Sequence, residues 1–189
     1  NLVHYSTDFV FDGRQSHPYG TTDKTRPMSV YGRTKLEGET RLLSNSWPGL
    51  RIVRTAWLFG PLKTNFVDKI LTLATQRDEL RVVHDQIGSP TYTPDLARHS
   101  VELLEKCGPG LYHLTNSGLA SWCELAAEAV AFAGLHCRIQ AISSAEYPQQ
   151  AVRPAYSVLD NADFIQATGI KPRSWTAALR EYVMARTEN

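Results

Sequence analysis

The sequence lacks the features of several specialised protein classes. It has no run of about 18 consecutive apolar residues, the length needed to cross a bilayer, and no acidic tail or long basic run. Its net charge of +1 differs from the strong basic excess of nucleic-acid-binding domains. We therefore expect neither a membrane nor a nucleic acid as a partner.

Patterns for metal binding and disulfide bonding are also absent. The three cysteines, Cys107, Cys123 and Cys137, are an odd number, and none belongs to a C-x-x-C pair. The histidines show no H-x-H or H-x-x-x-H spacing. Such a pattern is typical of reduced thiols in a cytoplasmic protein, so we expect a cytoplasmic location, no metal and no disulfide framework.

The residues that are present predict a packed α/β domain. The sequence is 42% hydrophobic and 21% charged, which is close to the globular average. Runs rich in β-branched residues alternate with longer segments of helical periodicity. We expect strands at 2–6, 50–55, 81–84, 111–114 and 138–142. We expect helices at 27–44, 65–76, 93–107, 121–133, 160–167 and 174–185.

This alternation indicates part of a Rossmann-like, doubly wound parallel sheet with a smaller α/β lobe. The elements become shorter after about residue 80, so we assign 1–80 to the sheet and 81–189 mainly to the lobe, with some interleaving. Thr93 is expected to be an N-cap before Pro94, and Ser121 with Glu124 a capping box.

Tyr31 and Lys35 are candidates for proton transfer. Four residues apart on a helix, they lie on one face. An ammonium group near a phenol favours the phenolate, which makes such a tyrosine a candidate proton donor. The same spacing also occurs in exposed pairs that only solvate a helix.

Polar and aromatic residues follow two of the predicted strands. Ser6, Thr7 and Asp8 end the first strand, and Trp57 comes just after the second. Ligands of open α/β sheets bind beyond the carboxyl ends of the strands. Thr7 could hold a carbonyl there, Asp8 a sugar hydroxyl or a proton, and Trp57 could cover a nicotinamide or a sugar ring. Strand-end turns and core tryptophans show the same pattern, and we expect Trp47, Trp122 and Trp175 to be packing residues.

Taken in order, six segments resemble the extended short-chain dehydrogenase/reductase family, and within it the dTDP-4-dehydrorhamnose reductases. The resemblance extends over nearly the whole chain. The segments are S-T-D-F-V-F-D-G at 6–13, P-M-S-V-Y-G-R-T-K-L-E-G-E at 27–39, R-T-A-W at 54–57, D-Q-I-G-S-P-T at 85–91, G-L-Y-H-L at 110–114 and R-P-A-Y-S-V-L-D at 153–160.

The resemblance implies NADPH- or NADH-dependent reduction of the C4 ketone of dTDP-4-dehydro-L-rhamnose to dTDP-L-rhamnose, a precursor of bacterial cell-surface polysaccharide. The implied partner is this nucleotide-sugar substrate, and a homodimer is left open. Implied catalytic residues are Thr7, Tyr31 and Lys35. Implied cofactor-binding residues are Ser6, Tyr31, Lys35, Thr55, Ala56 and Trp57. Implied substrate-binding residues are Asp8, Val10, Trp57 and Arg153, with Arg153 reaching the diphosphate.

The Gly-rich phosphate turn of that family, G-x-x-G-x-x-G, has no counterpart in this sequence. We therefore expect a dinucleotide-binding half of about 100 residues to be missing at the N-terminus, which leaves activity of this chain alone open. The choice between NADPH and NADH stays open for the same reason. Two other functions also remain open: a non-catalytic regulatory subunit, like that of methionine adenosyltransferase, and another nucleotide-sugar epimerase or reductase.

Overall fold

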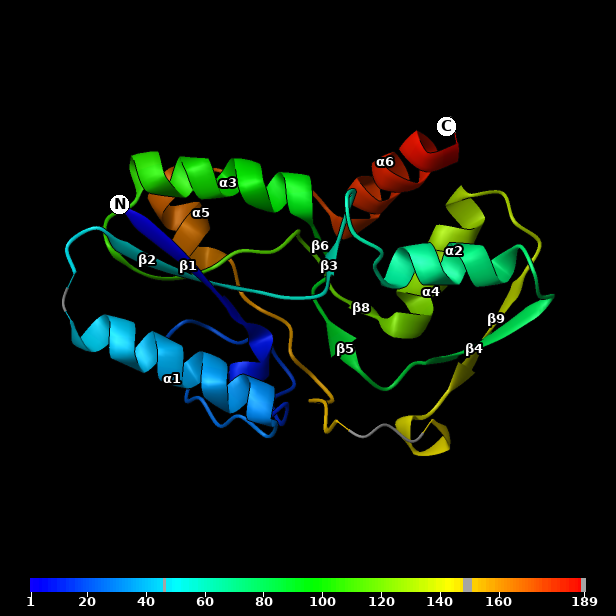
Figure 1. Cartoon of the computed structure of the whole chain (residues 1–189), viewed down its shortest axis with the longest axis horizontal. Coiled ribbons are helices and arrows are strands. Elements are labelled where there is room, and N and C mark those ends of the chain that lie inside the picture. The colour runs from blue at the N-terminus through cyan, green and yellow to red at the C-terminus, as the bar shows by residue number, and fades with distance from the viewer. Residues whose placement is uncertain (46, 148–150, 188–189) are drawn as a thin grey trace.

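A parallel sheet covered by helices forms one end of the molecule (Figure 1). The computed structural model describes residues 1–45, 47–147 and 151–187. The sheet has the order β1-β2-β7, with β2 in the centre. Helix α1 lies on one face, and α3 and α5 lie on the other. This arrangement confirms the predicted α/β class. The element bounds are β1 Leu2–Thr7, β2 Leu50–Thr55, β7 Gly110–His113, α1 Val30–Ser44, α3 Thr93–Lys106 and α5 Ala162–Thr168.

Strand β2 pairs with β1 on one side and β7 on the other, and both of its faces are covered. All of its residues are buried, and successive side chains point to opposite faces of a sheet. Val53 packs with Leu103 of α3 and Phe164 of α5. The next residue, Arg54, bonds to Glu39 of α1. Successive side chains of β2 therefore contact helices on opposite faces of the sheet, α3 and α5 on one face and α1 on the other.

The other end of the molecule is built around helix α4, which packs against α2, α6 and the parallel pair β4–β9. We call this part the lobe. Four two-residue strands and two short 3₁₀ helices, η1 and η2, complete the fold. The bounds are α2 Phe66–Ala74, α4 Trp122–Phe132, α6 Trp175–Thr187, β3 Leu58–Phe59, β4 Glu79–Val83, β5 Ile87–Gly88, β6 Thr91–Tyr92, β8 Ala120–Ser121, β9 Arg138–Ile142, η1 Asp8–Val10 and η2 Ser144–Glu146. The division of the chain at residue 80 stays a prediction. Three elements from beyond residue 80, β7, α3 and α5, lie with the β1-β2-β7 sheet, and we call this sheet with its helices the sheet part.

Every predicted strand and helix is present, with ends displaced by at most three residues. The first helix begins at Val30 and not near 27, because the Ser29 side chain caps it by accepting a hydrogen bond from the Gly32 N–H. The prediction that Thr93 is the N-cap of α3 was wrong. Thr93 is the first helical residue, and Tyr92 holds the cap position. The capping box of α4 is confirmed. The two-residue strands are too short for their alternation to be visible in the sequence.

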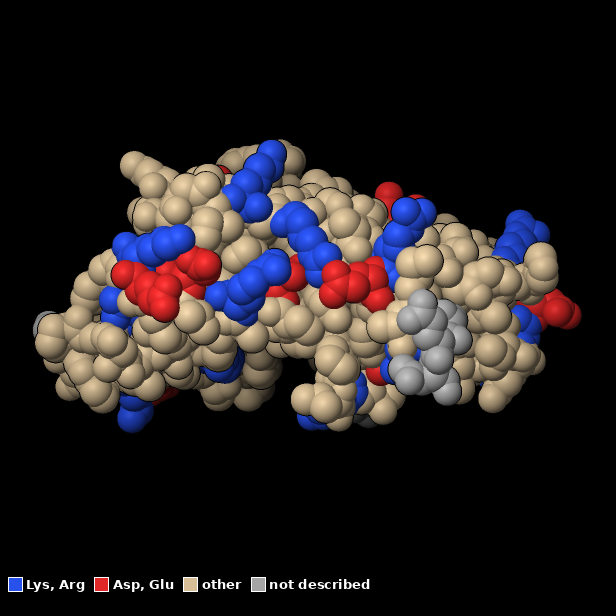
Figure 2. All heavy atoms as spheres, turned by 90° about the horizontal axis from the view of Figure 1, so that it is seen from above, with Lys and Arg blue, Asp and Glu red and all other residues tan. Residues whose placement is uncertain are grey.

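The surface charges, the helices and the possible metal ligands can be compared with what the sequence predicts. Figure 2 shows acidic and basic side chains interspersed over the face seen from above. Across 1–45, 47–147 and 151–187, no helix combines the length and apolarity that a membrane crossing needs. Within the same residues, no three histidine, cysteine or carboxylate side chains are grouped closely enough to hold a metal ion.

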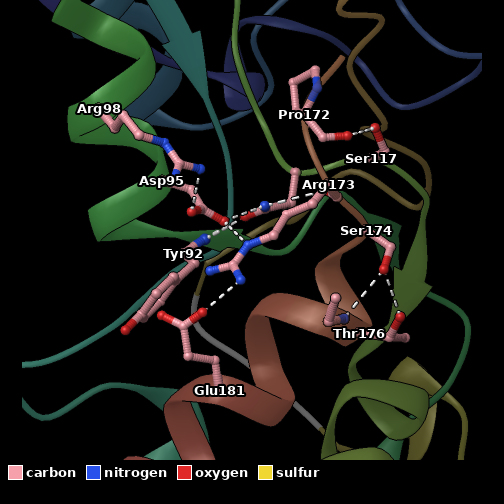
Figure 3. Close-up of polar contacts among 11 residues, drawn as sticks. Tyr92, Asp95, Arg98, Ser117, Pro172, Arg173, Ser174, Thr176 and Glu181 are labelled. Atoms are coloured by element: carbon pink, nitrogen blue, oxygen red, sulfur yellow. Dashed lines mark hydrogen bonds and ion pairs between the residues drawn. The ribbon is translucent and has the colours of Figure 1, made fainter. Parts of the chain in front are cut away.

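A polar network centred on Asp95 links the sheet part to the lobe (Figure 3). The Asp95 carboxylate, in the first turn of α3, accepts hydrogen bonds from Arg98 at 3.0 Å, Asn116 at 2.8 Å and Arg173 at 2.7 Å. Arg173 also reaches Glu181 of α6 at 2.5 Å. Burial alone would raise the pKa of Asp95, but the hydrogen bonds from Arg173 and Asn116 lower it below the ordinary value. The carboxylate therefore stabilises the fold in its charged form.

We predict that Asp95→Ala lowers the free energy of unfolding by about 2–3 kcal/mol, because Arg173, Asn116 and Arg98 each lose a hydrogen bond to the buried carboxylate. Urea denaturation measures the loss. Since the pKa of Asp95 is lowered by folding, its contribution is present above the unfolded value near pH 4 and disappears as the pH falls further. The matched control Glu181→Ala removes an exposed partner of the same arginine and should cost under about 1 kcal/mol. Equal losses for the two variants would contradict a central role for Asp95.

Candidate active site at the strand ends

The parallel register of β1 and β2 brings their carboxyl ends to one edge of the sheet. Thr7 pairs with Thr55 at the last position of the two strands. Beyond it the chain turns into η1, where the Thr7 hydroxyl accepts a hydrogen bond from the Phe9 N–H at 3.2 Å. The residues after both strands therefore meet at this edge, as the ends of parallel strands do in other α/β sheets.

A cavity of about 270 Å³ opens at this edge, and we call it the strand-end cavity. Sheet, α1 and lobe all contribute to its wall. Most of the predicted site residues line it: Ser6, Thr7, Asp8, Tyr31, Thr55, Ala56, Trp57 and Arg153. Three lining residues were not predicted: Phe9, Leu58 and Trp122.

Two predicted residues do not line the cavity. The Lys35 ammonium, one helical turn from Tyr31, donates to the Tyr5 carbonyl at 2.5 Å. The Val10 side chain is fully buried and packs with Phe11 and other core residues. Because η1 turns this side chain inward, the structure gives it a place in the core and not in the cavity wall expected from the sequence.

Two buried contacts hold helix α1 in place. Of its 15 residues only Gly32 and Glu39 are buried. A Cβ at Gly32 would lie 2.2 Å from the Phe9 carbonyl oxygen, so no larger residue fits there without a shift. Glu39 accepts two hydrogen bonds from Arg54 of β2, at 2.9 and 2.6 Å, with both side chains under 5% exposed. The position of Tyr31 beside the cavity depends on these two contacts.

The Asp8 carboxylate is the most perturbed group of the cavity. It is 2% exposed and accepts hydrogen bonds from the Thr7 hydroxyl at 3.0 Å and the Ser157 hydroxyl at 2.6 Å. Burial raises the pKa of Asp8 to about 6, although both hydrogen bonds act to lower it. Asp8 therefore gains or loses a proton close to neutral pH, as groups that take part in proton transfer often do.

Two hydroxyl groups in the cavity wall have no hydrogen-bond partner within the described parts of the chain. They belong to Ser6 and Thr55, each 5% exposed. Buried polar groups in folded proteins are nearly always paired, and an exception needs an explanation. Both residues line the strand-end cavity, so a ligand bound there would lie next to them.

The aromatic wall of the cavity comes from two tryptophans distant in sequence. Trp57 and Trp122 stack with ring centroids 3.6 Å apart and planes 4° apart. Trp122 packs against two clusters of the core, as predicted, and it also lines the cavity, because the tertiary fold brings it to Trp57. Trp175 is buried in the core as predicted, whereas Trp47 is 52% exposed and does not pack there.

A second cavity, of about 290 Å³, lies beside the first on the lobe side, and we call it the lobe cavity. Arg153 lines both cavities. A guanidinium at such a junction suits an anionic group, because its planar donors match phosphate and carboxylate oxygens. The remaining lining residues are Asp85, Gln86, Ser144, Tyr147, Ala151, Val152 and Ala155.

We predict that Glu39→Ala lowers the free energy of unfolding by about 3–5 kcal/mol, because it leaves the Arg54 guanidinium buried without its partner. The control Glu37→Ala breaks the exposed pair with Arg41 on the same helix and should cost less than about 0.5 kcal/mol. Denaturant unfolding of both variants tests the difference, and a small loss in Glu39→Ala would show that α1 is anchored in another way.

We also predict that Asp8→Asn stabilises the fold, and does so more strongly at pH 8 than at pH 4. The pKa of Asp8 rises from near 4 in the unfolded chain to about 6 in the fold. The folded state therefore holds a proton that the unfolded state releases, and stability falls as the pH rises through this window. Above it the gain of the variant should reach the order of 2–3 kcal/mol. Thermal unfolding at several pH values measures it. The control Asp78→Asn removes an exposed carboxylate, and the stability that it gains or loses should not increase with pH in this way.

Comparison with known proteins finds relatives that match nearly the whole chain. The chain is 44% identical over 185 residues to the spore coat polysaccharide biosynthesis protein SpsK of Bacillus subtilis, covering 98% of this chain and 64% of that protein. It is 44% identical over 191 residues to a dTDP-4-dehydrorhamnose reductase of Aggregatibacter actinomycetemcomitans, covering 95% of this chain and 65% of that one.

A solved structure shares the fold. The dTDP-4-dehydrorhamnose reductase of Bacillus anthracis, crystallised in complex with NADP, superposes with a TM-score of 0.91 at 34% identity, over 97% of this chain and 65% of that one. The chain thus spans about 64–65% of the length of these relatives. The family model described as the RmlD substrate binding domain matches residues 1–187, so the chain belongs to the RmlD substrate binding domain family.

Proposed function

We propose that this chain carries the proton-donating and sugar-binding residues of an NADPH- or NADH-dependent reductase. The proposed reaction reduces the C4 ketone of dTDP-4-dehydro-L-rhamnose to dTDP-L-rhamnose. The observation that supports it most is that Thr7, Asp8 and Tyr31 line one cavity. Two other lining residues, Ser6 and Thr55, have buried hydroxyls without a hydrogen-bond partner in the described residues. The similarity to reductases named for this reaction supports the same substrate.

The cavity wall fits the nicotinamide end of a dinucleotide. Ser6 and Thr55 offer buried, unpartnered hydroxyls to its polar atoms, and Ala56 and Trp57 line the same wall. Lys35, one turn from Tyr31, is the residue we assign to a ribose hydroxyl. When bound, the cofactor supplies the hydride that reduces the ketone carbon.

Tyr31 is the proposed proton donor to the oxygen of the reduced ketone, and Thr7 is the proposed group that holds this oxygen. The Thr7 hydroxyl has one proton, which it donates here to Asp8. If Asp8 carries its own proton, its carboxyl can donate to Thr7 instead, and the Thr7 proton becomes available to the ketone oxygen. The pKa of Asp8 near 6 makes both states accessible around neutral pH.

The substrate is proposed to span the two cavities. The sugar would bind in the strand-end cavity beside Asp8 and Trp57, and Arg153, which lines both cavities, would bind the diphosphate. The nucleoside would then lie toward the lobe cavity. The proposed location is the cytoplasm, because Cys107, Cys123 and Cys137 are all free thiols, as expected in a reducing compartment.

We predict that Tyr31→Phe lowers turnover by about 100-fold or more, because it removes the proton donor and leaves the ring in place. The assay follows NADPH oxidation with dTDP-4-dehydro-L-rhamnose, using the protein that contains this chain. The control Tyr112→Phe removes a hydroxyl that bonds to the Gly108 carbonyl away from the cavity and should leave turnover unchanged.

Retained turnover in Tyr31→Phe would refute the assignment of the proton donor. Turnover by the unsubstituted protein only with a different 4-keto sugar nucleotide would keep the mechanism and change the substrate. No turnover with any such sugar, together with binding to a methionine adenosyltransferase, would favour the regulatory alternative.

A further inference from the structure

Trp57 has a strained backbone at the end of β2. Its φ is +47°, in the left-handed region that costs a residue with a side chain about 1–2 kcal/mol. The residue lies between β2 and β3, where its carbonyl accepts a hydrogen bond from the Thr91 N–H at 3.1 Å. Strain of this kind persists only where surrounding contacts hold it, and it is common at binding sites.

Two residues from distant segments hold the indole of Trp57. Trp122, the first residue of α4, stacks on it with centroids 3.6 Å apart. Gly88 of β5 lies against its edge, so close that a Cβ there would be 2.4 Å from Cε2 and 2.5 Å from Nε1 of the indole. The antiparallel pairing of Gly88 with Ala120, two residues before Trp122, brings both contacts to the same place.

The support of Trp122 is itself rigid. The capping box of α4 fixes the backbone on either side: Glu124 accepts hydrogen bonds from the Ser121 N–H at 2.6 Å and hydroxyl at 2.9 Å, and Ser121 accepts one from the Glu124 N–H at 3.1 Å. Phe66 of α2 contacts the Trp122 ring at 4.6 Å between centroids. The lobe therefore holds Trp122 by backbone caps on one side and a ring contact on the other.

We propose that Trp122 and Gly88 are positioning residues that hold the Trp57 indole as the wall on which the sugar ring of the substrate binds. The inference rests on the proposed function. The cavity combines this flat apolar wall with the polar groups of Ser6 and Asp8. A deoxysugar has a matching division, since its C–H groups suit an aromatic face and its oxygens need hydrogen-bond partners.

The wall acts on the sugar and not on the nucleotide. Arg153, the group assigned to the diphosphate, also lines the lobe cavity, toward which the nucleoside is proposed to lie. Loss of the wall should therefore weaken binding of dTDP-L-rhamnose and leave binding of dTDP alone unchanged. A residue that served only the stability of the lobe would change both affinities together or neither.

The test compares Trp122→Ala, Trp122→Phe and Gly88→Ala with the unsubstituted protein. Calorimetry gives the dissociation constants of dTDP and dTDP-L-rhamnose. The dissociation constant of dTDP divided by that of dTDP-L-rhamnose measures how much the sugar adds to binding. We expect this ratio to fall by about tenfold in Trp122→Ala and Gly88→Ala, with most of it restored in Trp122→Phe, which keeps a ring to stack. Gly88 has an ordinary φ, and the three atoms nearest to a Cβ there all belong to the Trp57 indole, so its alanine variant acts first on that side chain.

Circular dichroism provides a readout that needs no ligand. Two stacked indoles couple electronically, and this signal should disappear in Trp122→Ala and change in Gly88→Ala. The control Trp47→Ala removes an exposed indole and should alter neither the signal nor the binding ratio. Melting curves show whether each variant is folded.

An unchanged binding ratio in a folded Trp122→Ala variant that has lost the coupled signal would overturn the inference and leave the proposed function standing. Failure of the unsubstituted protein to bind either compound or to turn over would refute the proposed function and the inference with it, while the circular dichroism would still report on the stacking.

Discussion

The buried ion pair between Arg54 and Glu39 is the interaction on which the site geometry depends. Helix α1 buries almost no apolar side chain, so the hydrophobic effect alone would leave its position on the sheet poorly defined. Two hydrogen bonds between fully desolvated charges are directional, and they require one placement of the helix along β2. Tyr31 and Lys35 take their places from that helix, with the close approach of Gly32 to Phe9 setting its depth.

The strand-end cavity is made by two parts of the fold that differ in chemistry. The sheet part supplies hydroxyl and carboxyl groups at the ends of β1 and β2 and the phenol of Tyr31 from α1, and the lobe supplies Trp122. The Asp95 network fixes the two parts relative to each other, as Figure 3 shows. The site also contains two unfavourable features, a carboxyl group buried without a cation and a tryptophan with positive φ. Proteins commonly retain such costs where binding or catalysis requires them.

Much of the fold could be predicted because local rules decide it. Periodicity located every strand and helix of more than three residues, and Ser121 with Glu124 marked the start of α4. The rules failed where neighbouring chain segments decide the outcome. Helix α1 begins at Val30 and not near 27, because the side chain of Ser29 caps it. The two-residue strands exist only because their partners lie beside them.

The sequence by itself determined the fold class and the family, and it marked candidate site residues, because the strand ends and the Tyr31–Lys35 spacing are local patterns. Only the tertiary structure decided which of those residues share a cavity. Val10 turned inward because η1 follows β1 directly, whereas Trp122, far along the chain, came to rest on Trp57 through the pairing of β5 with β8. Contacts between distant segments depend on how all the elements pack at once, and no local pattern in the sequence records that packing.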